Sequence, residues 1–295
     1  MGTWQFGDVR VDRILEFERP TLPPSQLFPT STPEAIARHR AWLEPRLLDP
    51  HSGLLVAAFH SFLVRSRGRT ILVDTCSGND KPRPQKQRYH LNRWPYLEHL
   101  AAAGVTPAQI DFVVWTHLHV DHVGWNTRLE KGRWVPIFPK AKYLLVRPEW
   151  DYWRKHYKTP TFVDDPYYLD SILPVIEAGQ AAYVSSDYRF TEEVWLEPTP
   201  GHTPGHVCVH VRSRDVECVM SGDLIHHPVQ CAEPEWSSCF CVDPDDARHA
   251  RGAFLQQYED GPVTILPAHF PTPTAGRIRR AGSAWQFEFL PDRGE

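Results

Sequence analysis

Three histidines and an aspartate lie within the six residues from His117 to His122, in the stretch "THLHVDHVGW". Single histidines and an aspartate follow downstream, each where a predicted strand ends. Imidazole and carboxylate groups are ligands suited to Zn²⁺, Mn²⁺ or Fe²⁺. Loops at strand ends are held by a rigid sheet, so such side chains can converge on one point. A solvated histidine-rich turn is the alternative, but it leaves the downstream residues without a role. The sequence therefore predicts a metal centre formed by His117, His119, Asp121, His122, His202, Asp223 and His269.

Strands and helices mix along the chain, which is typical of sheets covered by helices. The alternation of Val9, Val11 and Ile14 predicts an edge strand, and the proline-rich "PTLPPSQLFPTSTP" that follows is incompatible with the interior of an element. Further strands are predicted at "LLVAAFHSFLVRS", "TILVD", "IDFVVWT", "AKYLLV", "EVWLE", "HVCVHVRS", "VECVMSGD" and "VTILPAH". Helices are predicted from Thr32 as N-cap, and over Trp94–Ala103, Glu149–His156, Pro166–Ala178 and Pro244–Tyr258.

Composition excludes several classes of partner. The 295 residues carry a formal net charge of −4 with scattered Lys and Arg, so we expect no nucleic-acid partner. No apolar run approaches the roughly 20 residues needed to span a bilayer, so we expect no membrane association. The N-terminus lacks the features of a signal peptide, which favours a cytoplasmic location and reduced thiols at the six cysteines. The "CFC" pair, Cys239 and Cys241, lacks the spacing of a zinc knuckle.

The order of these motifs resembles that of the metallo-β-lactamase superfamily, whose signature is H-x-H-x-D-H followed by single His, Asp and His residues. The match runs from "ILVDT" at Ile71 to "LPAH" at His269. The resemblance implies an α/β fold, the αββα sandwich of two mixed β-sheets flanked by helices, with the site at one rim. We expect a single domain over residues 1–295, in which residues 1–50 form a lid or a dimerisation extension.

The resemblance also assigns the ligands. His117, His119 and His202 would hold one metal ion, and Asp121, His122 and His269 the second, with Asp223 between them. Two divalent ions are therefore expected, with zinc as first choice and manganese, iron or cobalt as alternatives. A hydroxide that bridges the two ions would be the nucleophile, because metal binding can lower the pKa of water to about 7. Asp74, in "ILVDT", resembles the aspartate that orients a metal ligand, and Cys76 stands where the family often has glycine.

Catalytic roles are predicted for Asp121 and His226. Acyl-homoserine lactonases of this superfamily usually have a tyrosine three residues after the bridging aspartate. Here that position is His226, in "GDLIHHPVQ", which is more similar to the branch that contains methyl-parathion hydrolase. The "VDPDDARHAR" stretch agrees with this similarity. His226 would polarise the scissile carbonyl or phosphoryl group or help the leaving group depart. The alternative is a histidine that only packs beside Asp223.

We therefore predict a metal-dependent hydrolase that acts on a small apolar lactone or ester, with organophosphate triesterase activity as a second activity. A β-lactamase-type amide hydrolase and a diiron oxidoreductase of the same fold are the alternatives. The partners expected are a small-molecule substrate and, in a homodimer, a second copy of the chain. Aromatic residues near the motifs are candidates for a hydrophobic pocket wall: Trp125, Phe138, Trp150, Trp153 and Phe270.

Overall fold

The computed structural model describes residues 2–157 and 166–291, in which the strands form three sheets. The largest has the order β1-β2-β3-β4-β5-β8-β9: Thr3–Phe6, Val9–Leu22, Leu55–Ser66, Arg69–Val73, Phe112–Val114, Lys142–Val146 and Ala181–Val184. The second runs in sequence order from β10 to β15: Val194–Pro198, Val207–Ser213, Val216–Met220, Thr264–Leu266, Gly276–Ala281 and Ala284–Phe289. A separate hairpin joins β6 (Thr127–Glu130) to β7 (Arg133–Pro136). Both large sheets combine parallel and antiparallel pairs, as predicted.

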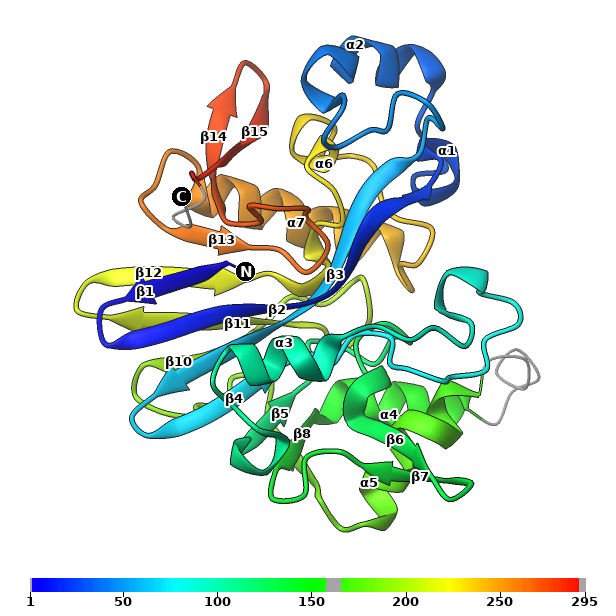
Figure 1. Cartoon of the computed structure of the whole chain (residues 1–295). Helices are drawn as coiled ribbons and strands as arrows, with labels where there is room; N and C mark the ends of the chain where they lie inside the picture. Colours follow the sequence, from blue (N-terminus) through cyan, green and yellow to red (C-terminus); the bar gives the residue numbers. More distant parts are fainter. Residues whose placement is uncertain (1, 158–165, 292–295) are drawn as a thin grey trace.

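The helices cover the outer faces of the two large sheets (Figure 1). Those beside the first sheet are α3 (Tyr96–Ala102), α4 (Arg147–His156) and α5 (Leu173–Glu177), whereas α7 (Pro244–Tyr258) packs on the second. The short α1 (Pro24–Leu27), α2 (Pro33–Leu43) and α6 (Val229–Ala232) share a separate apolar cluster. Thr32 caps α2 by accepting a hydrogen bond from the Ala35 amide, as the sequence predicted.

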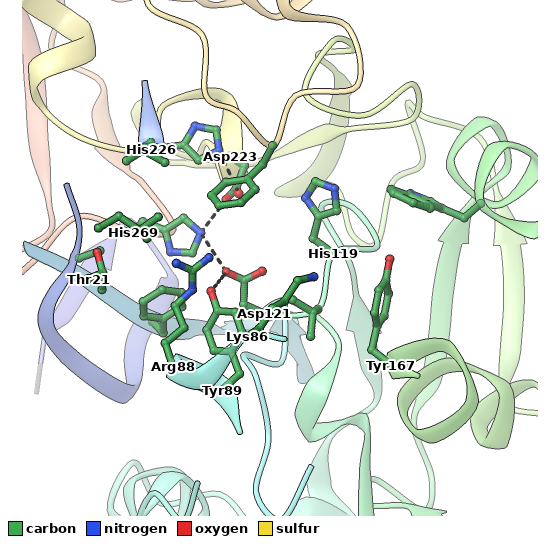
Figure 2. Close-up of a pocket in the computed structure, with 17 residues that line it drawn as sticks. Thr21, Lys86, Arg88, Tyr89, His119, Asp121, Tyr167, Asp223, His226 and His269 are labelled. Carbon is green, nitrogen blue, oxygen red and sulfur yellow. Dashed lines mark hydrogen bonds and ion pairs between the residues drawn. The ribbon is translucent and has the colours of Figure 1, made fainter. Parts of the chain in front are cut away.

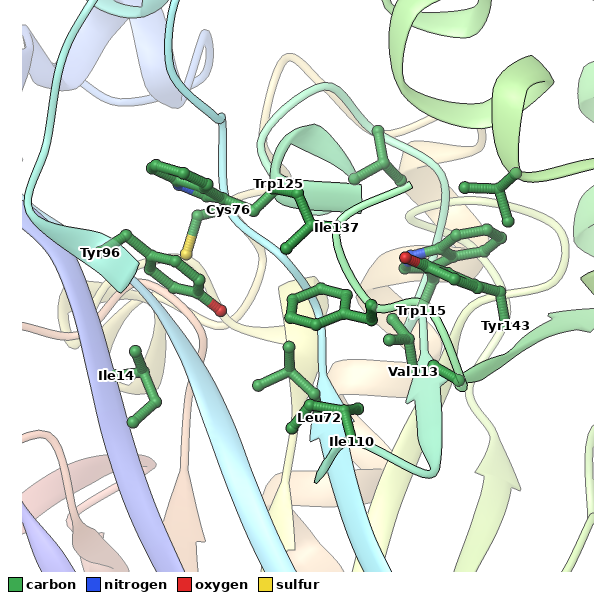
Figure 3. Close-up of a cluster of buried hydrophobic side chains, with 14 of the residues drawn as sticks. Ile14, Leu72, Cys76, Tyr96, Ile110, Val113, Trp115, Trp125, Ile137 and Tyr143 are labelled. Carbon is green, nitrogen blue, oxygen red and sulfur yellow. The ribbon is translucent and has the colours of Figure 1, made fainter. Parts of the chain in front are cut away.

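Side-chain alternation along the strands produces this layering. In β4, Leu72 faces the helices of the first sheet, while Ile71 and Val73 face the second sheet. In β12, Cys218 and Met220 face the first sheet, and Val219 faces α7. Figure 3 shows the first apolar cluster, in which Leu72 and Val113 of the sheet lie near aromatic side chains from the adjoining loops and α3. Three apolar layers between four layers of elements make the predicted αββα sandwich.

Two local predictions were wrong. Val9 and Val11 belong to β2, which pairs with β1 and β3, so the edge strand is β1. The proline-rich stretch also contributes to elements, because β2 continues to Leu22 and α1 begins at Pro24. The predicted Pro166–Ala178 helix is present as a π-helical turn over Tyr168–Ile172 that continues into α5.

The helices among the described residues are too short or too polar to cross a membrane. All six cysteines, which lie within that part of the chain, are free.

A buried ionic cluster anchors the long loop after β4. Arg83 donates two hydrogen bonds to the Asp170 carboxylate, at 2.6 and 2.7 Å. The Lys81 ammonium donates to Thr127 Oγ1 at 2.6 Å and to the Asp170 backbone carbonyl at 2.9 Å. Burial lowers the pKa of Lys81 to about 7. The cluster ties residues 81–83 to the π-helical turn, and so positions the residues that follow them in the loop.

Candidate metal centre

All seven predicted ligands lie at one rim of the sandwich, where strands of both sheets end. Residues 117–122 follow β5, and His202 lies in the turn between β10 and β11. Asp223 lies in the short 3₁₀ turn Gly222–Leu224 after β12, and His269 follows β13. The candidate ligand atoms form two groups, each with its atoms within 4.8 Å of one another: His117, His119, His202 and Asp223, then Asp121, His122 and His269. The structure therefore brings together every residue that the sequence selected.

In the first group three imidazole nitrogens point at one another. His117 Nε2 lies 3.0 Å from His119 Nδ1, and His202 Nε2 lies 3.1 and 2.9 Å from these two atoms. A neutral imidazole carries a single N–H, so three ring nitrogens that converge cannot all be satisfied by one another. A cation satisfies three lone pairs at once, and three histidines are a common zinc ligand set. The residues present thus fit a divalent metal ion.

Asp223 joins the two groups. Its carboxylate oxygens lie 3.0–3.7 Å from the Nε2 atoms of five histidines: His269, His122, His226, His202 and His117. The buried Asp223 Oδ1 and His122 Nε2 have no hydrogen-bond partner among the described residues. Buried polar atoms are normally paired, so these two atoms also indicate a site for a cation.

In the second group, hydrogen bonds on the far side of His122 and His269 fix the tautomers of these two imidazoles. His122 Nδ1 donates to Asp74 Oδ2 at 2.8 Å, and His269 Nδ1 donates to the Ala58 carbonyl at 3.1 Å. When Nδ1 carries the proton, the Nε2 lone pair faces the centre and can bind metal. Asp74 also accepts from the Thr116 amide and hydroxyl, both at 2.8 Å. Asp74 therefore orients His122 and the start of the histidine loop together.

Burial disfavours the charged imidazole in both groups, but the net pKa shifts of the two groups have opposite directions. Burial lowers the pKa of His119 to about 3 and that of His117 and His202 well below the usual range, so these imidazoles are neutral at physiological pH. Burial also disfavours charge on His122 and His269, but the neighbouring Asp223 carboxylate outweighs it and raises the pKa of both. A metal ion and a proton compete for these two Nε2 atoms.

The turn that carries Asp74 keeps its geometry without glycine. Asp74 has a φ of 58° and Cys76 a φ of 46°, both in the left-handed region that favours glycine. The turn is held from outside: the buried Glu16 carboxylate accepts hydrogen bonds from the Ser77 and Gly78 amides at 3.0 and 2.9 Å. Cys76 is fully buried in the apolar cluster beside it, where it fills space.

His206 faces away from the ligand nitrogens. Its Nδ1 lies 2.8 Å from Thr199 Oγ1, and its Nε2 accepts a hydrogen bond from the Asp223 amide at 3.0 Å. Burial lowers the pKa of His206 to about 4, which keeps Nε2 unprotonated as this contact requires. His206 thus positions Asp223 through its backbone.

The metal centre opens into a cavity of about 200 Å³. Leu22, Leu27, Ala57, Phe59, Val120, Trp153 and Phe240 supply apolar wall, while Lys86, Arg88, Asp121 and His226 are among the polar residues. Figure 2 shows Asp121, Asp223, His226 and His269 together on one side of the cavity and Tyr167 on the other. Of the five aromatic residues predicted as candidates, Trp153 lines it; Trp125, Phe138 and Phe270 are buried in apolar clusters, and Trp150 packs against one.

His226 faces the cavity beside Asp223, with its Nε2 atom 3.3 Å from Asp223 Oδ2. Its backbone amide is held by the Gln230 side chain at 2.7 Å. Neither ring nitrogen has a hydrogen-bond partner among the described residues. The imidazole is therefore fixed at its base and lies beside the Asp223 carboxylate at the cavity wall.

Two cavity residues, Tyr89 and Arg88, were missed in the sequence. The Tyr89 hydroxyl donates a 2.7 Å hydrogen bond to Asp121 Oδ2. The Arg88 guanidinium lies 4.9 Å from the Tyr89 ring centre and 5.5 Å from that of Phe240, and it is directed toward the ligands in Figure 2. The sequence feature that could have pointed to these two residues is the length of the loop between "ILVD" and Trp94, because long loops in compact domains are often functional.

A model of the metallo-beta-lactamase superfamily matches residues 60–269. Metallo-hydrolase mfmC of Annulohypoxylon moriforme is 28% identical over 148 residues, which cover 44% of this chain and 35% of that protein. N-acyl homoserine lactonase AttM of Rhizobium radiobacter is 29% identical over 134 residues, covering 40% of this chain and 45% of that protein. The aligned part thus spans less than half the length of either relative.

Two solved structures share the fold over nearly the whole chain. The hydrolase AbOPH, described as in the beta lactamase superfamily, has a TM-score of 0.81 at 23% identity and covers 98% of this chain and 97% of its own. AidC, described as a dizinc quorum-quenching lactonase, has a TM-score of 0.78 at 20% identity, with the same coverage. At these identities the likeness concerns the fold.

Proposed function

Because the chain belongs to the metallo-β-lactamase superfamily, we propose that it is a metal-dependent hydrolase of small apolar lactones or esters. The observation that carries the proposal is the position of the two ligand groups, which share Asp223 and border a largely apolar cavity. One group would hold each of two divalent ions, with zinc as first choice. When bound, such ions polarise a substrate oxygen and acidify a coordinated water to a pKa of about 7.

Three residues of the chain would then transfer a proton, position the proton carrier and stabilise the charge that develops on the substrate. Asp121, which faces the cavity, is suited to carry a proton to the leaving oxygen. Tyr89 holds the Asp121 carboxylate by its 2.7 Å hydrogen bond and so limits its rotation. His226, on the same side of the cavity, would donate a hydrogen bond to the carbonyl oxygen as charge develops there.

The cavity favours a small and mainly apolar substrate. Its volume of about 200 Å³ accommodates a compact ring or a short acyl chain. Phe59, Trp153 and Leu27 would contact apolar parts of the substrate, and the Arg88 guanidinium could bind an acceptor oxygen. The names of AttM and AidC agree with a lactone as first choice.

His226→Ala is expected to lower kcat for the best ester or lactone by about 10²-fold, the typical effect of removing one transition-state hydrogen-bond donor. Metal content should stay at the wild-type level. His226→Gln, which retains an N–H donor, should recover part of the loss. Steady-state kinetics with metal analysis on the same preparations check this. Unchanged kcat in His226→Ala would leave His226 only a packing role.

The substrate class is tested on one preparation of known metal content, with lactones, aryl esters and paraoxon-type phosphotriesters assayed side by side. We expect turnover of lactones or aryl esters that disappears on chelation and returns with added Zn²⁺, Mn²⁺ or Co²⁺. Hydrolysis that survives complete chelation would overturn the proposed mechanism.

Phosphotriester hydrolysis is a second candidate activity. It is favoured by His226 at the position three residues after Asp223, and by the fact that one metal centre can activate water toward carbon or phosphorus. Phosphotriester turnover without lactone turnover in the same panel would reverse the order of the two candidates.

The N-terminal residues contribute to the cavity wall. Thr21, Leu22 and Leu27 line it, and residues 3–22 include two strands of the large sheet. The single domain over residues 1–295 stays a prediction. The role of residues 1–50 as a lid or as a dimerisation extension also stays a prediction.

A further inference from the structure

A buried carboxylate outside the ligand set connects two of the metal-binding loops. Glu149 lies in the first turn of α4 and is 3% exposed. Its Oε1 atom accepts hydrogen bonds from the Leu118 amide at 2.8 Å and the Trp153 indole at 2.6 Å. Its Oε2 atom accepts from the Gly205 amide at 3.0 Å. Burial raises the pKa of Glu149, and these donors act against that rise because they favour the ionised form.

The two backbone donors belong to the loops that carry the three-histidine group. Leu118 lies between His117 and His119 after β5, in the first sheet. Gly205 lies three residues after His202, in the turn between β10 and β11 of the second sheet. The two loops are far apart in sequence and belong to different sheets, yet one carboxylate accepts a hydrogen bond from each.

The packing around Glu149 makes this connection rigid. Strand β8 pairs with β5, and α4 begins directly after β8, so the helix is fixed relative to the histidine loop. A Cβ atom at Gly205 would collide with the Glu149 backbone, which shows how closely the His202 turn approaches α4. Trp153, one helical turn after Glu149, also places its ring 5.5 Å from that of His119, edge to face.

We propose that Glu149 is a positioning residue that holds His117, His119 and His202 in metal-binding geometry by joining their two loops. The inference rests on the proposed function, since it concerns the assembly of the same metal centre. Residues that orient metal ligands typically change metal affinity by about 10–100-fold when they are replaced. Glu149 acts on the ligands through backbone amides next to His117 and His119 and in the His202 turn, so we expect the larger effect at the three-histidine group.

The chain offers a matched control in Glu193. This carboxylate is also buried, and it accepts hydrogen bonds of 2.7 Å from the Ser66 and Ser213 hydroxyls, at the ends of β3 and β11. Neither serine lies in a loop that carries a candidate ligand. Glu193→Gln and Glu149→Gln therefore make the same chemical change at a buried carboxylate, but only Glu149→Gln places an amide N–H₂ against a donor of the histidine loops.

The experiment is a Co²⁺ titration of metal-free wild type, Glu149→Gln and Glu193→Gln against a competing chelator, followed by visible absorption and by bound metal. We expect two Co²⁺ in wild type and in Glu193→Gln. In Glu149→Gln one of the two should bind about 10–100-fold more weakly. The absorption bands lost should be those lost in a His119→Ala reference, which identifies the site.

Wild-type affinities in Glu149→Gln would overturn the inference alone, as would an equal loss at the same site in Glu193→Gln. A wild type that binds no Co²⁺ would overturn the proposed function and this inference with it. If Glu149→Gln does not fold, amide hydrogen exchange on metal-free wild type decides. Leu118 and Gly205 should then be protected to the same degree as β5. Exchange of both amides at unprotected rates would show that Glu149 does not hold the loops.

Discussion

Replacement of Asp223 by alanine is expected to abolish detectable hydrolysis, with a loss of about 10³-fold or more. The physical reason is the position of this carboxylate, whose oxygens lie within 3.7 Å of five imidazole nitrogens and contact both ligand groups. In the proposed two-metal centre, loss of this charge is expected to remove several kcal/mol of transition-state stabilisation, and each 1.36 kcal/mol corresponds to a factor of ten in rate.

Asp223→Asn separates charge from shape, because the amide retains one acceptor oxygen. We expect bound metal to fall in both variants, and to fall further in Asp223→Ala. The measurements are kcat/KM and metal per chain on the same samples. Asp187→Ala, at an exposed position in the second half of the chain, serves as the control and should match wild type. Two bound metal ions with wild-type kcat/KM in Asp223→Ala would contradict the assigned role of Asp223.

Asp170→Ala should cause the largest loss of stability, about 3–5 kcal/mol in the free energy of unfolding. Its carboxylate receives both hydrogen bonds from the buried Arg83 guanidinium and lies 3.5 Å from the Lys81 ammonium. Arginine cannot lose its proton, so removal of Asp170 takes away a carboxylate that pairs with a buried positive charge. The same change should loosen the loop that carries Arg88 and Tyr89, and therefore raise KM.

Urea unfolding monitored by tryptophan fluorescence measures this loss. Asp80→Ala is the matched control in the same loop, because the Asp80–Arg93 pair is exposed and should contribute about 0–1 kcal/mol. Although burial opposes it, Arg83 and Lys81 hold the pKa of Asp170 below its usual value. Its contribution is thus present at neutral pH and lost as the pH falls through that lowered pKa. Equal unfolding free energies for Asp170→Ala and Asp80→Ala would refute the prediction.

The convergence of the candidate ligands could be predicted from the sequence because each one lies in a loop that follows a strand with a clear apolar pattern. The strand that positions His269 is visible in "VTILPAH", and the strand that positions Asp223 is visible in "VECVMSGD". Strand-end residues of adjacent strands meet at one rim, so local pattern was enough to bring them together. The sandwich layers were predictable for the same reason, since Ile71, Leu72 and Val73 alternate between two apolar clusters.

The residues that the sequence did not reveal depend on contacts between distant segments. Tyr89 reaches Asp121 from a loop that the Lys81–Arg83–Asp170 cluster anchors, and no periodic pattern encodes that cluster. In the sequence, Glu149 cannot be distinguished from an acidic residue that only favours the first turn of a helix. Its role depends on the contacts with Leu118 and Gly205, which the sequence does not show. The N-terminal strand order was mistaken because β1 is a four-residue strand whose pairing with β2 is not visible in local alternation.

The most direct test of the account is a crystal structure of freshly purified protein with anomalous scattering recorded at the absorption edge of the bound metal. We predict two anomalous peaks about 3.5–4 Å apart. One should lie among His117, His119 and His202, the other among Asp121, His122 and His269, with Asp223 between them. A single ion held by the three-histidine group, with Asp121 and His269 not engaged, would contradict a dinuclear centre.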